Sequence, residues 1–116
     1  MITVYGIKNC DTCRKALKWL KAAGIDHQFH DFRKEGLDPS LLSTWVGEVG
    51  WEKLLNRRGT TWRNLSDAEK DGVDETKAEA LMVENPTLIK RPVFEAENKI
   101  VVGFSAAEQE ALNRVT

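Results

Sequence analysis

Two cysteines separated by two residues are the side chains in this sequence best suited to chemistry. Cys10 and Cys13 are the only cysteines among the 116 residues. Two thiols at this spacing are too close together to form the disulfide framework of a secreted domain, so a bond between them would serve a reaction. Such a pair exchanges disulfides when one thiol ionises readily and the other attacks the mixed disulfide. The spacing predicts a redox pair.

The residues around the cysteines predict a strand, a helix and a second strand. An alternating apolar pattern, an amphipathic pattern and a second apolar run indicate elements over residues 2–5, 12–23 and 25–32. Gly24 suits the left-handed residue that ends a helix, and Asn9 or Asp11 is available to cap its beginning. The two strands of such a βαβ unit should be parallel, with a right-handed crossover.

Cys10 falls at the predicted start of this helix, where unsatisfied N–H groups and the helix dipole favour a thiolate. Lys8, Arg14 and Lys15 are close in sequence and should lower the pKa of the thiol further. Cys13 falls on the apolar stripe of the helix, so it should be the less exposed thiol and the candidate resolving cysteine. The alternative is that both cysteines are simply small buried side chains.

A zinc site is a second alternative, because His27 and His30 follow Cys10 and Cys13 in the chain. The two residues between the histidines are fewer than zinc fingers use, and the predicted strand and helix are in the reverse order. Residues three apart on a strand also point to opposite faces. We therefore expect no metal site, and we expect the histidines to lie at the surface or at a sheet edge.

Caps and apolar stripes predict helices from Arg33 to about Pro86. Asp38 and Pro39 mark one helix start, and the apolar stripe that follows extends to Gly50. Further helices are predicted over residues 51–56, at the capping box of residues 66–69, and over residues 75–84.

The end of the chain returns to strand patterns. Residues 92–95 and 99–102 read as a β-hairpin with a turn at Glu97-Asn98. Ser105 and Glu108 have capping-box spacing at the start of a closing helix.

The element order βαβ, helices, ββα predicts an α/β protein with a thioredoxin-like fold and a helical insertion between its two halves. The predicted core covers residues 1–32 and 87–116, and the predicted insert covers residues 33–86. At this length the chain is expected to form a single domain over residues 1–116.

Three arginines are candidates for an anion pocket. Arg91 precedes Pro92, and a cis bond in this position of a thioredoxin-like core would bring the backbone of Arg91 close to Cys10. A trans proline at a strand start is the alternative. Arg57 and Arg58 could add positive charge from the insert, although a double arginine is also common on a solvated face. The four tryptophans are expected to pack in the core or between parts of the chain.

The overall charge argues against a nucleic-acid-binding protein. Seventeen Lys and Arg residues balance eighteen Asp and Glu residues, for a formal net charge of −1. The apolar runs are far shorter than the roughly 20 residues of a membrane helix, so we expect no membrane association. The first residues read as a strand rather than a secretory signal, which predicts a cytoplasmic protein.

These motifs together resemble the arsenate reductase (ArsC) family of thioredoxin-like proteins, most closely its YffB branch. The resemblance covers nearly the whole chain and is carried by YGIKNCDT (5–12), RRGTTWR (57–63), LIKRPV (88–93) and VGF (102–104). It implies that Cys10 is a single nucleophile and that Arg91 belongs to an anion site.

The YffB branch implies a glutathione-dependent thiol reductase, with glutathione as co-substrate and no bound cofactor. The expected anion- or glutathione-binding residues are Lys8, Asn9, Thr12, Arg14, Arg57, Arg58, Arg91 and Pro92. The broader family implies arsenate reduction linked to glutathione and glutaredoxin, but an arginine expected near the last strand has no match here. Cys13 adds a likeness to the Spx regulators, which sense disulfide stress and bind RNA polymerase.

Overall fold

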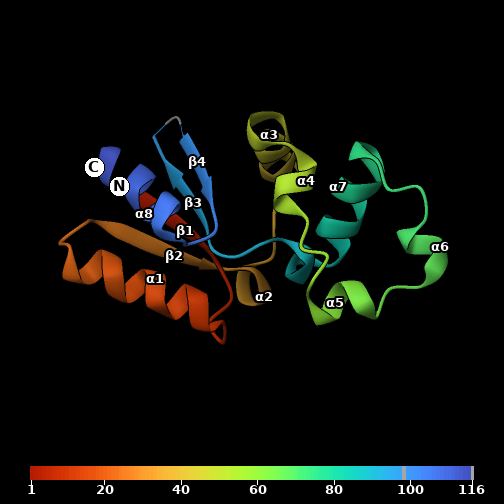
Figure 1. Ribbon diagram of the computed structural model, residues 1–116, viewed down its shortest axis with the longest axis horizontal. Helices are drawn as coiled ribbons and strands as arrows, with labels where there is room; N and C mark the ends of the chain where they lie inside the picture. Colours follow the sequence, from red (N-terminus) through yellow and green to blue (C-terminus); the bar gives the residue numbers. More distant parts are fainter. Residues whose placement is uncertain (98, 116) are drawn as a thin grey trace. The chain divides into compact units, whose positions relative to one another are not determined.

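A computed structural model of the protein describes residues 1–97 and 99–115 (Figure 1). The chain divides into two compact units, which we call the core unit (Met1–Glu35 with Arg91–Thr116) and the insert unit (Gly36–Lys90). The sequence places the ends of the insert at residues 33 and 86 instead, and a single domain over the whole chain stays a prediction.

The core unit is built on a mixed four-stranded sheet. Its strands are β1 (Ile2–Gly6), β2 (His27–Asp31), β3 (Val93–Ala96) and β4 (Lys99–Val102). They lie in the order β2-β1-β3-β4. The β1 and β2 strands are parallel and joined through α1 (Asp11–Ala22), which confirms the βαβ prediction. The β3 and β4 strands form the predicted antiparallel hairpin. Glu97 adopts a left-handed φ of 49° in its turn, and Asn98 lies outside the described residues.

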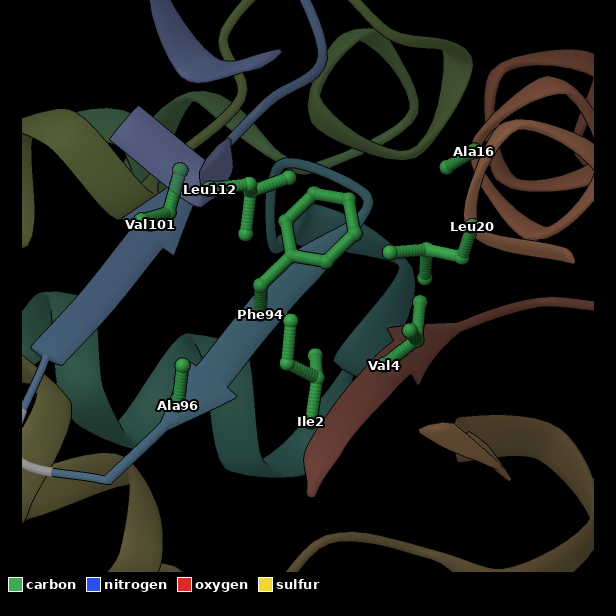
Figure 2. Packing of buried hydrophobic residues seen from close by; sticks show 8 residues of the cluster. All are labelled: Ile2, Val4, Ala16, Leu20, Phe94, Ala96, Val101 and Leu112. Carbon is green, nitrogen blue, oxygen red and sulfur yellow. The ribbon is translucent and has the colours of Figure 1, made fainter. Parts of the chain in front are cut away.

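Both long helices of the core unit cover the same face of this sheet. Side chains from β1, β3, β4, α1 and α8 (Ala106–Arg114) converge on one apolar cluster (Figure 2). Its members are all buried: Ile2, Val4, Ala16, Leu20, Phe94, Ala96, Val101 and Leu112. Because each fully buried Leu or Phe contributes about 1.5–3 kcal/mol, this cluster holds both helices against the sheet.

At the ends of the helices and strands, the structure confirms some predictions from the local sequence and contradicts others. Cys10 itself is the N-cap residue of α1, so the predicted capping by Asn9 or Asp11 is wrong. Gly24 takes the predicted left-handed conformation after the helix, with a φ of 70°. Phe32 was expected at the end of a strand but begins the short helix α2 (Phe32–Glu35), where its buried ring stacks on another aromatic ring.

The insert unit is helical, as its caps predict. Its elements are α3 (Pro39–Val49), α4 (Trp51–Leu54), α5 (Thr60–Arg63), α6 (Asp67–Lys70), α7 (Glu75–Glu84) and the 3₁₀ helix η1 (Pro86–Leu88). The Asp38 side chain caps α3, and Ser66 with Glu69 forms the predicted capping box of α6. An antiparallel bridge between Leu55 and Ile89 joins the segment after α4 to the segment after η1.

Candidate active site

Cys10 lies at the end of the loop between β1 and α1, directly before the first residue of the helix. Its backbone N–H donates to the carbonyl of Ile7 (3.1 Å), and its own carbonyl accepts from the backbone N–H of Arg14 (3.0 Å). These bonds fix the backbone of Cys10 at the start of the helix. Cys10 is partly exposed, whereas Cys13, one turn later, is only 1% exposed. One thiol therefore meets solvent and the other lies beneath it, as the sequence predicts.

The pKa values of the two thiols are shifted in opposite directions. Partial burial alone would raise the pKa of Cys10, but the backbone N–H and thiol of Cys13 and the guanidinium of Arg91 outweigh burial and lower this pKa. Burial raises the pKa of Cys13 to about 12, and the neighbouring Cys10 sulfur contributes to the rise. Cys10 is thus the thiol of the pair that ionises more readily, and Cys13 is the one that holds its proton more tightly.

Arg91 is brought to Cys10 by the pairing of the strands. Tyr5, next to the last residue of β1, lies opposite Val93 at the start of β3. Arg91 and Pro92, which directly precede β3, therefore lie beside the loop that follows β1. The Arg91-Pro92 peptide bond is cis, as the sequence predicts. Pro92 is buried, and its carbonyl accepts from the backbone N–H of Gly103 at the end of β4 (2.8 Å).

The Arg14 side chain forms hydrogen bonds with the loop that precedes α1. Its guanidinium donates to the Lys8 carbonyl (3.3 Å), to Asn9 Oδ1 (3.5 Å) and to Asp11 Oδ1 (3.3 Å). We expected it to lower the pKa of Cys10, but that shift comes from Cys13 and Arg91. Arg14 is therefore a residue that shapes the loop around the thiol.

The remaining predicted residues of this loop are exposed. The sequence did not predict one contact of the loop, with Asp31. The Lys8 and Thr12 side chains lie at the surface of the core unit. The backbone N–H of Lys8 lies 3.4 Å from Asp31 Oδ2, which links the loop to the end of β2. The sequence signal that could have identified Asp31 is its position as a polar residue at the end of the strand parallel to β1.

Arg57 and Arg58 lie in the insert unit, and their side chains have different surroundings. The Arg57 guanidinium lies over the rings of Trp51 and Trp62, 5.3 and 5.8 Å from their centroids. The Arg58 side chain is exposed, and its backbone N–H donates to Asn56 Oδ1 (3.0 Å). A pocket that combines these arginines with Arg91 stays a prediction.

The two histidines have their own contacts on β2. The His27 ring nitrogen lies 2.8 Å from the Ile25 carbonyl, and the His30 ring packs against Tyr5 and lies 3.8 Å from Glu35. Within residues 1–97 and 99–115, no three His, Cys, Asp or Glu side chains are grouped to hold a metal ion. Over the same residues, no helix has the length and apolar character needed to cross a bilayer.

Known proteins match this chain over most of its length. A model of the ArsC family matches residues 5–112. The solved YFFB protein is 40% identical with a TM-score of 0.92, covering all of both chains. An arsenate reductase (ArsC) related protein from Brucella melitensis is 49% identical with a TM-score of 0.78, over 97% of this chain and 94% of that one. Regulatory protein MgsR from Bacillus subtilis (strain 168) is 33% identical, over 92% of this chain and 86% of its own. The predicted thioredoxin-like α/β fold is confirmed, and the chain belongs to the ArsC family.

Proposed function

We propose that the protein is a cytoplasmic thiol-disulfide oxidoreductase that uses Cys10 as nucleophile and glutathione as co-substrate. The observation that carries this proposal is the pairing of a partly exposed Cys10, whose pKa is lowered, with a buried Cys13, whose pKa is raised to about 12. A purely structural pair of cysteines has no need of this asymmetry.

The first step is attack of the Cys10 thiolate on a mixed disulfide between a substrate thiol and glutathione. A bond forms between Cys10 and the glutathione sulfur, the old disulfide bond breaks, and the substrate leaves as a thiolate that takes a proton from water. A second glutathione thiolate then attacks the adduct, giving glutathione disulfide and restoring the Cys10 thiolate. One glutathione thiol is thereby oxidised to the disulfide level and the substrate sulfur is reduced to a thiol, without a bound cofactor.

Cys13 offers a second way to resolve the adduct. Its raised pKa is due first to burial and then to the neighbouring Cys10 sulfur. Once Cys10 is bonded to glutathione, the negative charge on Cys10 is gone, so Cys13 loses its proton more readily. Its thiolate then attacks Cys10, forms the Cys10–Cys13 disulfide and releases glutathione. Two further glutathione thiols return both cysteines to the reduced state.

The carboxylates of glutathione need positive charge and hydrogen-bond donors near the thiolate. Arg91, which precedes buried Pro92, is a cation of the core unit that hydrogen bonds to Cys10 and lowers its pKa. We propose that it works with the loop residues Lys8, Asn9, Thr12 and Arg14, and with Arg57 and Arg58 of the insert unit.

The test combines thiol reactivity with turnover. The alkylation rate of Cys10 is followed against pH by peptide mass spectrometry, and reduction of a glutathione mixed disulfide is measured in parallel. We expect a Cys10 pKa below about 8.5, no turnover in Cys10→Ser, and turnover through glutathione in Cys13→Ser. Full activity of Cys10→Ser would overturn the proposal.

Arsenate reduction is a second candidate, favoured by the similarity to the Brucella melitensis protein. Here the Cys10 thiolate would attack the arsenic atom of arsenate beside Arg91, forming a sulfur–arsenic bond and displacing one oxygen as water. Two glutathione thiols, with glutaredoxin as partner, would then supply the electron pair that reduces the arsenic, releasing arsenite and leaving glutathione disulfide. Production of arsenite from arsenate in the presence of both reductants would support it, and a lack of arsenite would exclude it.

A redox-controlled regulator is a third candidate, favoured by the similarity to MgsR. In this case the Cys10–Cys13 disulfide would change the start of α1 and thereby binding to RNA polymerase. Pull-downs with purified polymerase under reducing and oxidising conditions test it. If neither pull-down recovers polymerase, the regulator candidate is excluded.

A further inference from the structure

Two charged side chains of opposite sign hold the turn that leads into Cys10. The Cys10 N–H donates to the Ile7 carbonyl (3.1 Å), which closes a four-residue turn with Lys8 in its first central position. The backbone N–H of Lys8 donates to Asp31 Oδ2 (3.4 Å), and the Lys8 carbonyl accepts from the Arg14 guanidinium (3.3 Å). Both polar groups of the Lys8 backbone therefore have a charged partner.

Asp31 reaches this turn because of the register of the two parallel strands. It is the last residue of β2 and lies opposite Gly6, the last residue of β1. Lys8 follows Gly6 by two residues, so its N–H comes beside the Asp31 carboxylate. Arg14 approaches the same residue from the beginning of α1. The turn is thus held by side chains from two different elements.

Both oxygens of the Asp31 carboxylate accept a backbone hydrogen bond. Oδ2 accepts from Lys8, and Oδ1 accepts from the N–H of Arg33 in α2 (2.8 Å). The Asp31 N–H in turn donates to Glu35 Oε2 (3.1 Å), so α2 fixes this residue at two points. An asparagine side chain has one acceptor oxygen and one NH₂ group. It could accept from Arg33 but not from Lys8 as well.

The position of the turn matters for attack on a bound disulfide, whereas ionisation of the thiol depends on other groups. In exchange, the bond to the Cys10 sulfur forms as the old disulfide bond breaks, so the attacking sulfur must lie in line with that bond. The lowered pKa of Cys10 comes from Cys13 and Arg91. A loosened turn should therefore impair alignment and leave the pKa unchanged.

We propose that Asp31 is a positioning residue for Cys10, which holds the turn through the Lys8 N–H while Arg14 holds the Lys8 carbonyl. Asp31 acts through the backbone of Lys8 rather than on the sulfur itself. The effect on the reaction rests on the proposed function, whereas the contact between Asp31 and the turn does not.

Asp31→Asn tests the proposal, because it keeps the acceptor for Arg33 and removes the one for Lys8. We expect kcat for a glutathione mixed disulfide to fall about tenfold with KM nearly unchanged. Alkylation of Cys10 by iodoacetamide, including its pH profile, should not change, since a freely diffusing reagent adjusts its own orientation. Asp38→Asn is the matched control. Asp38 caps α3 through one bond, from the Ser40 N–H to Oδ1 (2.9 Å), which asparagine retains.

Amide hydrogen exchange at Lys8 is a readout that does not depend on turnover. We expect exchange there to be about tenfold faster in Asp31→Asn than in Asp38→Asn. Equal exchange at Lys8 in the two variants would overturn the proposal. Equal kcat values would also overturn it, as would a loss of kcat no larger than the fraction unfolded in a thermal unfolding curve. If the unmodified chain does not turn over the mixed disulfide, the proposed function fails, and exchange at Lys8 alone then decides whether Asp31 holds the turn.

Discussion

Gly6 and Cys13 pack so closely that a β-carbon on Gly6 would overlap the Cys13 sulfur. Gly6 is the last residue of β1, and Cys13 lies on the face of α1 that is turned toward this strand. The Ile7 backbone N–H hydrogen bonds to the same sulfur and lowers the pKa of Cys13, although burial, the largest influence, raises it. The absent side chain of Gly6 therefore gives the buried thiol its place beneath Cys10.

Gly6→Ala should destabilise the protein by about 1–3 kcal/mol, because the new methyl group overfills a packed site. In a Cys13→Ala background the same change should cost less than about 1 kcal/mol, since the sulfur that it strikes is gone. A double-mutant cycle by urea unfolding measures this coupling. Gly47→Ala is the control, because a β-carbon there meets no atom within 4 Å. Equal costs of Gly6→Ala in both backgrounds would contradict the packing argument.

Arg91→Gln should raise the pKa of Cys10 toward its ordinary value. Burial already opposes ionisation of this thiol, and the substitution removes the charge of Arg91 that counteracts it. At neutral pH the variant then holds less thiolate and is alkylated more slowly. Arg14→Gln should leave the pKa of Cys10 nearly unchanged, because the Arg14 guanidinium is bonded to the loop. The pH profile of iodoacetamide alkylation distinguishes the two variants, and equal shifts would contradict the assignment.

The buried Cys13 thiol should make stability fall at alkaline pH. In the folded chain its pKa is raised to about 12, first by burial, whereas an unfolded chain releases this proton near about pH 8.5. Between these values the unfolded state binds fewer protons than the folded state, so the free energy of unfolding decreases as pH rises.

Urea unfolding under reducing conditions, from about pH 8.5 upward, checks this effect. The comparison is Cys10→Ser against Cys10→Ser with Cys13→Ala, which removes any contribution from the first thiol. The chain that retains Cys13 should lose stability more steeply with rising pH. Parallel profiles would show that Cys13 ionises as easily in the folded state as in the unfolded one.

Ser105→Ala should lower the free energy of unfolding by about 1 kcal/mol through loss of the α8 cap. Ser105 and Glu108 form a capping box, with Ser105 Oγ 2.6 Å from Glu108 Oε1. This helix places Leu112 on the sheet, so fraying at its start weakens core packing. Ser40→Ala, at an exposed site inside α3, is the matched control and should be nearly neutral. Chemical unfolding of both variants measures the difference, and equal effects would contradict the role of the cap.

The sequence was a good guide wherever neighbouring residues decide the structure. The Asp38 cap and the Ser105–Glu108 box were predicted because capping depends on residues at most three positions apart. The parallel βαβ unit and the hairpin follow from the lengths of their connections. Where distant residues compete, the local signal failed: Asn9 was predicted as a helix cap, but its side chain bonds to Arg14.

The sequence by itself determined the fold family and the position of a cysteine pair at the start of a helix, because both depend on motif and periodicity. Only the tertiary structure decided which cations act where. Arg91 reaches Cys10 because β3 pairs with β1, and Arg57 is held by two tryptophan rings of the insert unit. Electrostatic interactions depend on distance in space, and that distance is settled by strand pairing and packing rather than by separation along the chain.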